Sequence, residues 1–344
     1  MKKCRILNAS SKHIFNGCVV KSTSSINESK TMNKFILIVL LITTFSSCSK
    51  QKRSDKAATK MQNFVIAISN YARGYNPNFI IIPQNGTELA FLNIDPNDGL
   101  NTDYMSAVDG FGVEELYYNG SNALDNERLS MLQKLAPSKK IMVAEYVSDN
   151  ATISDAISKN YNQGFICFPR TSSNYDYLQI PDSVIKENST DILNLSLAQN
   201  YLYLISTDNF ISKQDFLNAI SATNFDVILI DLFFNGEAFT SSEINLLKMK
   251  SNGAKRLVIS YLNIGSAEKF RYYWKKSWGQ HHPLWLKKKY EGYKDEIWVK
   301  YWKKDWQNII YGNDESYLKK IIDANFDGAY LDNVEAFYFL YYKN

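Results

Sequence analysis

From residue 61 to the C-terminus, short apolar segments alternate with segments in which apolar and polar residues are mixed. The apolar segments are rich in β-branched and aromatic residues and end in polar ones, which is typical of buried parallel strands. We predict eight strands, at residues 79–83, 107–113, 140–147, 164–168, 201–206, 225–232, 256–262 and 327–331.

Most of the mixed segments have a helical pattern. In residues 61–75 apolar side chains recur at 61, 64, 65, 68, 71 and 72, the period of a helix that covers a core. Further helices are expected at residues 126–135, 153–161, 213–222, 241–250, 267–278, 305–324 and 334–342. Strands alternating with helices predict an α/β fold, and eight strands favour a (β/α)8 TIM barrel. The alternative is a doubly wound open sheet, but no Gly-x-Gly-x-x-Gly follows a strand, so nothing indicates a dinucleotide cofactor.

The segment before residue 61 has the pattern of an export signal. Lys34 precedes an apolar run, residues 35–45, that is too short to span a bilayer but suits the core of a signal peptide. Small residues then lead into Cys48, which resembles the lipobox of bacterial lipoproteins, where this cysteine is lipidated. A plain signal peptide is the alternative. We therefore expect an exported lipoprotein, anchored to a membrane through Cys48, in the periplasm or at the cell surface.

This interpretation divides the chain into four parts. They are an over-extended start at 1–31, a lipoprotein signal peptide at 32–47, a polar tether at 48–60 and a single (β/α)8 domain at 61–344. With Cys48 acylated, Cys167 is the remaining thiol of the mature chain, and its apolar surroundings predict that it is buried.

Composition and charge argue against two classes of function. Seven of the 39 Lys and Arg residues and one of the 35 Asp and Glu residues fall in the first 47 positions, so the remainder carries 32 basic and 34 acidic residues. The part of the chain after residue 47 is therefore close to neutral and has no net positive charge to attract nucleic acid, so we expect no nucleic-acid partner. Four scattered cysteines and three histidines, without a Cys-x-x-Cys pair, do not favour a metal site.

Residues 275–304 form a segment longer than an ordinary βα loop. It contains four of the six tryptophans and nine lysines. In a barrel such an insertion would lie over the C-terminal face, where substrates bind. Its lysines suit either an anionic polymer or simply a solvated lid.

Polar residues at the C-terminal ends of the strands are the candidates for chemistry in a barrel. Carboxylates dominate there: Glu114, Glu115, Glu145, Asp208, Asp231 and Asp332. No Gly-x-Ser-x-Gly motif and no strand-end histidine support Ser/His catalysis. Paired carboxylates with many aromatic residues, 14% of the chain, are typical of a glycosidase, which needs one protonated and one ionised carboxyl. Capping of the following helix is the structural alternative for Asp332.

Several segments resemble the endo-α-1,4-polygalactosaminidase family, glycoside hydrolase family 114. The strand-and-helix segment RLVISYLNIGSAEKFRYYW at 256–274 carries most of the resemblance, with VKYW at 299–302 and FDGAYLDN at 326–333. Upstream, IPQNG at 82–86 and DGFGVEELY at 109–117 are also similar to the family. The order of the two blocks is the reverse of the family's, so the resemblance implies a circularly permuted barrel. It then implies that the strand at 79–83 pairs with the strand at 327–331, and that the helix at 61–75 packs beside the C-terminal helix.

The resemblance implies an endo-acting hydrolase of an α-1,4-linked galactosamine-containing polysaccharide, a monomer that needs no cofactor. Its catalytic pair carries over to Asp332 as nucleophile and Glu114 as general acid/base, although the roles are exchangeable and Glu115 is an alternative to Glu114. Other residues are expected to contact sugar or to orient those that do: Gln84, Asn85, Asp231, Tyr261, Glu268, Arg271, Lys300, Tyr301 and Asn333. Glu268 and Arg271, three apart on an expected helix, are equally compatible with a surface ion pair. Two positions depart from the family pattern. Ser266 stands where an acidic residue is common in the family, and Glu145 stands where an Asp is common. Gly110 and Gly112 are expected to leave room for a sugar ring below Glu114.

Two other classes of protein remain open. A non-catalytic glycan-binding lipoprotein would keep the aromatic residues but would not need both carboxylates. A polysaccharide deacetylase or other metal hydrolase needs a His/Asp ligand set that the strand ends do not supply.

Overall fold

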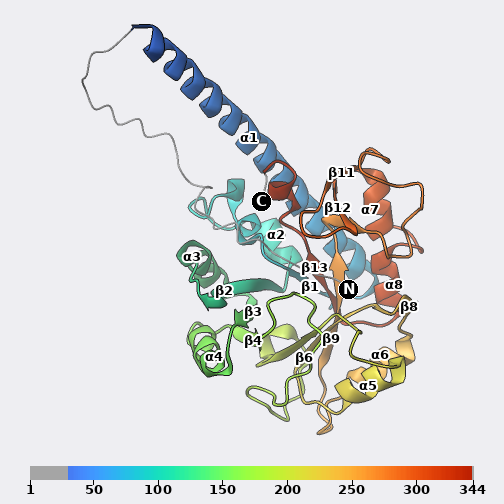
Figure 1. Cartoon of the computed structure of the whole chain (residues 1–344). Coiled ribbons are helices and arrows are strands. Elements are labelled where there is room, and N and C mark those ends of the chain that lie inside the picture. Colours follow the sequence, from blue (N-terminus) through green and yellow to red (C-terminus); the bar gives the residue numbers. More distant parts are fainter. Residues whose placement is uncertain (1–29, 343–344) are drawn as a thin grey trace.

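The computed structural model describes the backbone of residues 30–342 and, Asn150 apart, the side chains of residues 50–342. Two parallel sheets form its centre (Figure 1). The larger sheet has the order β1-β13-β9-β6-β5 and the smaller β2-β3-β4. Their bounds are β1 Ile80–Pro83, β2 Gly110–Asn122, β3 Lys140–Val147, β4 Ile166–Arg170, β5 Tyr201–Leu204, β6 Val227–Asp231, β9 Leu257–Asn263 and β13 Gly328–Asp332. All eight predicted strands are present, and the α/β class with a parallel central sheet is confirmed.

Backbone contacts continue from one sheet to the other. The amide of Asn85, just after β1, donates to the carbonyl of Gly112 in β2 at 2.7 Å, and the amide of Asp109 donates to the carbonyl of Ile81 at 2.8 Å. Gln84 and Gly112 form a parallel bridge. At the other end of the order, β4 contacts β5. The strands therefore follow one another as β4-β3-β2-β1-β13-β9-β6-β5.

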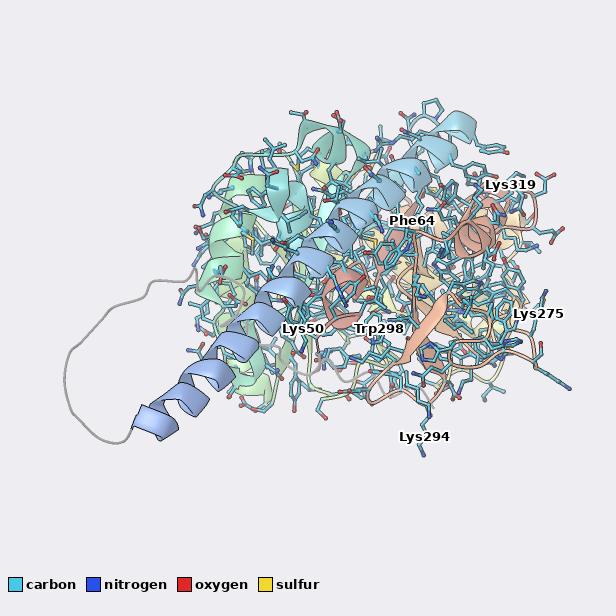
Figure 2. All side chains as sticks on the ribbon, turned by 90° about the horizontal axis from the view of Figure 1, so that it is seen from above. Lys50, Phe64, Lys275, Lys294, Trp298 and Lys319 are labelled. Atoms are coloured by element: carbon cyan, nitrogen blue, oxygen red, sulfur yellow. The ribbon has the colours of Figure 1, made fainter. Side chains whose placement is uncertain are left out.

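The first and the last strand of the described chain, β1 and β13, lie side by side. These strands pair in parallel, with Ile80 opposite Gly328 and Pro83 opposite Leu331, as predicted. The long helix α1, Lys30–Tyr75, crosses the body and packs on α9, Ala336–Phe339 (Figures 1 and 2). The expected pairing of the strands is confirmed. The contacts of α1 with the C-terminal segment include Ser54 with Phe337 and Gln51 with Tyr342, so the packing of residues 61–75 beside the C-terminal helix stays a prediction.

The segment expected to be a tether belongs to α1. From Ser54 onward the helix is anchored: the Ser54 hydroxyl donates to the Phe337 carbonyl at 3.2 Å, and Ala57 and Ala58 are fully buried. Small side chains at these positions let the helix approach the body closely. Residues 1–29 lie outside the described residues, as does the side chain of Cys48. No helix in the described part of the chain combines the length and apolarity that crossing a membrane requires.

The remaining helices flank the strands. They are α2 Thr102–Ala107, α3 Asn126–Leu135, α4 Ile153–Tyr161, α5 Lys213–Ser221, α6 Ser241–Leu247, α7 Lys304–Ile310 and α8 Tyr317–Asp323, with 3-10 turns at Thr87–Ala90, Leu92–Ile94, Asn150–Thr152 and Leu195–Leu197. The expected helix at 305–324 is two helices, because Tyr311 is extended and Gly312 has a φ of +97°. Cys167 is buried in β4, as predicted.

The expected helix at 267–278 is wrong. Instead β10, Ser266–Glu268, β12, Glu296–Val299, and β11, Leu286–Lys289, form a small antiparallel sheet. The segment between β10 and β11 consists of turns, in which the Tyr273 ring packs edge-on against Trp306. In the view from above, Lys275 and Lys294 of this insertion point outward at the edge of the molecule (Figure 2). A second hairpin joins β7, Phe233–Phe234, to β8, Glu237–Ala238.

An aspartate stands directly before each of three strands, β2, β6 and β13. Asp109, Asp226 and Asp327 each accept a backbone N–H and bind a cation at 2.6–2.9 Å. The cations are Arg73, Lys250 and Lys248, respectively. These ion pairs tie the N-terminal ends of the strands together, opposite the end where the catalytic candidates lie.

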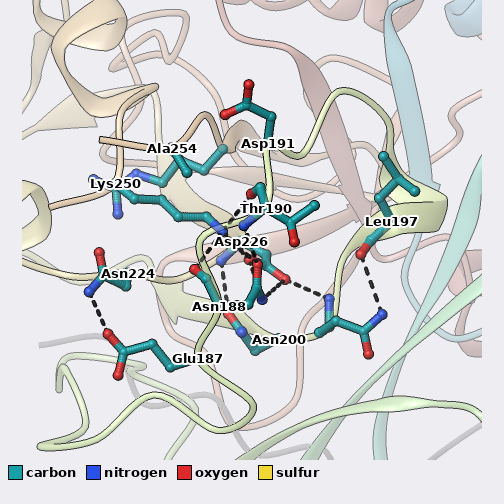
Figure 3. A network of polar contacts seen from close by, with 12 residues as sticks. Glu187, Asn188, Thr190, Asp191, Leu197, Asn200, Asn224, Asp226, Lys250 and Ala254 are labelled. Carbon is teal, nitrogen blue, oxygen red and sulfur yellow. Dashed lines mark hydrogen bonds and ion pairs between the residues drawn. The ribbon is translucent and has the colours of Figure 1, made fainter. Parts of the chain in front are cut away.

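The ion pair of Asp226 and Lys250 is the most buried of the three, with neither side chain exposed. Figure 3 shows the polar network around it. The Lys250 ammonium also donates to the carbonyls of Asn188 and Thr190, and Asp226 accepts from the Asn188 side chain. The network therefore fixes the irregular segment that follows β4 to the base of β6.

Candidate active site

Glu114 lies where the regular pairing of β2 with β3 ends, and Asp332 lies at the C-terminal end of β13, with β1 between the two strands. Glu114 is 4% exposed, and Asp332 is partly exposed. The Asp332 charge is near enough to raise the pKa of Glu114. The structure thus brings the two expected catalytic carboxyls to one site.

Glu114 is held by one tyrosine. The phenol of Tyr177 donates to Oε1 at 2.5 Å, while Oε2 is buried without a hydrogen-bond partner. Burial is the main cause that raises the pKa of Glu114, to about 8, with Asp332 and Glu115 adding to the effect; the Tyr177 phenol and Arg170 oppose it. Glu114 is therefore protonated at neutral pH, with one oxygen available to carry the proton.

Asp332 is held by a different tyrosine. The phenol of Tyr261 donates to its Oδ2, and the backbone amide of Asn333 donates to Oδ1 at 2.7 Å. Burial raises the pKa of Asp332 to about 6, while these two donors lower it. At neutral pH Asp332 is mostly ionised, so the two carboxyls occupy opposite protonation states.

Glu115 has a different environment from its neighbour. It stands at a φ of +56° and turns away to Arg170, whose guanidinium donates to its Oε1 at 2.6 Å. Tyr175 donates to the same oxygen at 2.6 Å. The engaged carboxylate of Glu115 and the unpartnered oxygen of Glu114 favour Glu114 as the acid.

Glu145 has a structural function in β3. Its oxygens accept the amides of Tyr117 and Tyr118 at 3.0–3.2 Å and the side chain of Asn160 at 2.8 Å. These amides lie where the pairing of β2 with β3 shifts register after Glu114. Glu145 therefore stabilises the bulge that ends the regular part of β2 beside the site.

Tyrosines fill the space below the carboxyls. The Tyr177 and Tyr203 rings stack at 3.7 Å, and Tyr203 meets Tyr330 edge-on at 5.6 Å. A Cβ on Gly112 would lie 1.9 Å from the Tyr330 hydroxyl, and one on Gly110 would lie 2.7 Å from the Lys140 carbonyl. The expectation that these glycines leave room for a sugar is wrong: the room is taken by the Tyr330 phenol and by the neighbouring strand.

Asp231, Arg271 and Glu268 form one buried ion triad. Arg271 donates to both oxygens of Asp231, at 2.8 and 2.7 Å, and to Glu268 at 2.6 Å. Their side chains are 4–6% exposed. The spacing of Glu268 and Arg271 correctly indicated an ion pair, but it is buried and lies on β10 and the turn after it, not on a helix surface.

The structure places the other expected residues in two groups. Asn85 accepts the Glu114 amide at 3.2 Å, and Gln84 accepts the Tyr203 phenol at 3.3 Å, so both border the site. Lys300 instead donates to the Leu284 carbonyl. Tyr301 is fully buried and donates to the Ala57 carbonyl in α1, which leaves its hydroxyl no part in binding a substrate.

Sequence reasoning missed Tyr177 and Glu335. Tyr177 lies in the long irregular segment after β4, where no periodicity marks it. Glu335 is half-buried; burial raises its pKa to about 8, and Glu88, Glu114 and Asp332 add to the effect. Its position three residues after Asp332 could have marked Glu335 as a candidate from the sequence.

Two pockets open near these elements. One, of about 380 Å³, lies at the ends of β5 and β6, and one of about 1000 Å³ lies between β4, α4 and the segment that follows β4. Neither is lined by Glu114 or Asp332, although Tyr177, which donates to Glu114, lines the larger one. Among the residues with described side chains, no three His, Cys, Asp or Glu are arranged to hold a metal ion.

Comparison with known proteins supports a glycoside hydrolase. The model of glycoside-hydrolase family GH114 matches residues 209–344. That range contains Asp332, Tyr261 and the ion triad but not Glu114. An uncharacterized protein of Thermotoga maritima is 34% identical over 121 residues, 34% of this chain and 35% of the relative. The uncharacterized protein MJ1477 of Methanocaldococcus jannaschii is 34% identical over 151 residues, 44% of this chain and 41% of the relative. The matches therefore cover well under half of these relatives' length.

Proposed function

We propose that this chain is an endo-acting glycoside hydrolase that cleaves an α-1,4-linked, galactosamine-containing polysaccharide with Glu114 and Asp332. The observation that carries the proposal is the split between the two carboxyls, with a pKa of about 8 for Glu114 and about 6 for Asp332. A glycosidase needs such a pair, one protonated and one ionised, at the same pH.

The proposed reaction has two steps. Glu114 donates its proton to the glycosidic oxygen as Asp332 attacks the anomeric carbon, so the bond to the leaving sugar breaks and a glycosyl ester forms. Glu114, now ionised, takes a proton from water, which attacks the same carbon and releases Asp332 as a carboxylate. Tyr177 and Tyr261 hold the two carboxyls in place through both steps.

The acidic surroundings of the pair support an amino sugar as the substrate. Glu335 is half-buried beside Glu114 and Asp332, and the charge of Glu88 further raises its pKa. At neutral pH Asp332 carries the negative charge that a substrate ammonium would meet, whereas Glu114 and Glu335, each with a pKa of about 8, are mostly protonated.

We propose further that the eight strands close into a (β/α)8 barrel with its halves in permuted order. The hydrogen bonds between β1 and β2, and the contact of β4 with β5, support closure. The pairing of β1 with β13 supports permutation, because a ring whose ends adjoin can be opened at another point without losing its contacts. The proposed anchor is a lipid on Cys48, which would hold this domain at a membrane.

The test is hydrolysis of partially deacetylated galactosaminoglycan, measured by the appearance of new reducing ends. We expect the wild type to produce them, and Glu114→Gln and Asp332→Asn each to lose about 10²–10⁴-fold in kcat. Glu315→Gln, an equally isosteric change at an 86% exposed side chain, is the control and should retain full activity. Wild-type binding without new reducing ends would instead favour a non-catalytic glycan-binding lipoprotein.

A further inference from the structure

The pocket at the ends of β5 and β6 is separate from the carboxyl pair. Its volume is about 380 Å³. It is lined by residues that follow β5, by β6 and the β7–β8 hairpin, and by the turn after β10: 205–208, 231, 233, 235–236 and 270–272. Nothing in the proposed chemistry uses this pocket.

The pocket lies at the same end of the strands as Asp332. Asp231, in its wall, pairs in register with Tyr261 of β9, and Tyr261 donates to Asp332 on the next strand. Two strand spacings separate β6 from β13, about 10 Å. A sugar ring bound in this pocket would therefore belong to a different residue of the polysaccharide from the ring that is attacked at Asp332.

Two aromatic side chains stand at the rim of the pocket. Phe270 is 47% exposed and Tyr272 is 45% exposed. Both are supported from behind: Arg271 lies 4.9 Å from the Phe270 ring centre, and Phe233 lies 5.7 Å from that of Tyr272. Aromatic rings that are about half exposed at the rim of a pocket offer an apolar surface to the C–H face of a sugar.

The polar groups of the pocket favour a neutral or cationic guest. Its one cation, Arg271, is already matched by Asp231 and Glu268, whereas the carboxylate of Asp208 is exposed. The Thr207 hydroxyl donates to Asn235 at 2.8 Å, which joins the two loops across the pocket. An anionic sugar would meet uncompensated negative charge here.

We propose that this pocket is a distal subsite that binds one neutral or amino-bearing pyranose of the polysaccharide, beyond the bond that is cleaved. The inference rests on the proposed function for the identity of the polymer, but it adds a second point of attachment. It makes the enzyme favour long chains over short ones, because only a long chain reaches both the pocket and Asp332.

The experiment compares Phe270→Ala with Tyr75→Ala, which removes another exposed ring at the far end of α1. Binding of the galactosaminoglycan to Asp332→Asn protein is measured by affinity electrophoresis, with and without each change. We expect Phe270→Ala to weaken binding about tenfold, the loss of one stacking contact, and Tyr75→Ala to leave it unchanged. In active protein, Phe270→Ala should lower kcat/KM on the polymer far more than on the shortest oligosaccharide that is cleaved.

A second variant guards against a folding defect. Asp208→Arg changes an exposed side chain and places a larger, cationic one in the pocket, which narrows it for any pyranose and repels an amino-bearing one. It should therefore reproduce the loss on long chains while thermal unfolding stays as in the wild type. If wild type cleaves the polymer and neither variant alters binding or chain-length preference, the subsite is wrong and the proposed function stands. If wild type cleaves nothing, the proposed function fails, and the binding measurement still decides on the pocket.

Discussion

The two tyrosines that hold the carboxyls should control opposite limbs of the pH profile. Activity needs Asp332 ionised and Glu114 protonated, so kcat/KM should rise as pH passes about 6 and fall as it passes about 8. Tyr177 donates to Glu114 and Tyr261 donates to Asp332. Each donor stabilises the ionised form of its carboxyl and so lowers its pKa. Removing a donor must therefore raise the corresponding pKa and move one limb to higher pH.

The size of each pKa shift follows from the strength of one hydrogen bond. A hydrogen bond to a charged group contributes about 1.5–3 kcal/mol, and a neutral carboxyl retains part of it. A net change of about 1.4 kcal/mol corresponds to one pH unit. Tyr177→Phe should thus move the alkaline limb up by about one unit and widen the profile. Tyr261→Phe should move the acidic limb up by about one unit and narrow it.

The assay is kcat/KM for a defined oligosaccharide between pH 4 and 10, with Tyr203→Phe as the control. The Tyr203 hydroxyl donates to Gln84 at 3.3 Å and not to a carboxyl, so its loss should leave both limbs in place. The reasoning is refuted if Tyr177→Phe moves the acidic limb, or if both variants leave the profile as it is in the wild type.

Three further changes test other parts of the structure. Asp226→Asn leaves the buried Lys250 ammonium without its carboxylate, and urea unfolding should show a loss of about 3–5 kcal/mol. Gly112→Ala drives a methyl group into the Tyr330 hydroxyl and should cost about 1–3 kcal/mol in the same measurement. Cys48→Ala should move the protein from the membrane fraction to the soluble one, because the proposed lipid is the anchor.

Two controls separate these effects from general damage. Lys320→Ala breaks an ion pair with an exposed carboxylate and should cost less than about 1 kcal/mol. Gly74→Ala adds a Cβ with nothing within 4 Å, near the end of α1, and should be neutral or stabilising. Equal losses in Lys320→Ala and Asp226→Asn would contradict the importance given to the buried network, and a Cys48→Ala protein that stays in the membrane would place the anchor elsewhere.

The strands were predictable because each is buried on both faces. Such strands must be continuous apolar runs, and those runs stand out in the sequence at β3 and β6 as clearly as in the structure. The β10–β12 sheet was not predictable by the same rule. Its strands are short, and β11, Leu286–Lys289, is mostly lysine, so neither alternation nor an apolar run marks it. The aromatic pattern of 267–278 instead resembled a helix.

Side-chain contacts between distant segments could not be predicted from the sequence, for a different reason. Strand ends can be listed from a pattern, which is why Glu114 and Asp332 were candidates. The partner of each carboxyl depends on which loop lies over it. Tyr261 is on a strand and was expected to be near, whereas Tyr177 lies in an irregular segment fixed by the Asp226 and Lys250 network at the other end of the sheet.

The family match covers only part of the proposed machinery. The match at 209–344 includes β13 and Asp332, whereas Glu114 lies before it, in β2. β1 pairs with β13 on one side and is hydrogen-bonded to β2 on the other, so it joins the strand that carries Asp332 to the strand that carries Glu114. A fragment containing only the matched segment would keep Asp332, Tyr261 and the ion triad but lack a proton donor. Under the proposed mechanism hydrolysis therefore requires both halves, and the residues outside the match are as much a part of the proposed enzyme as those within it.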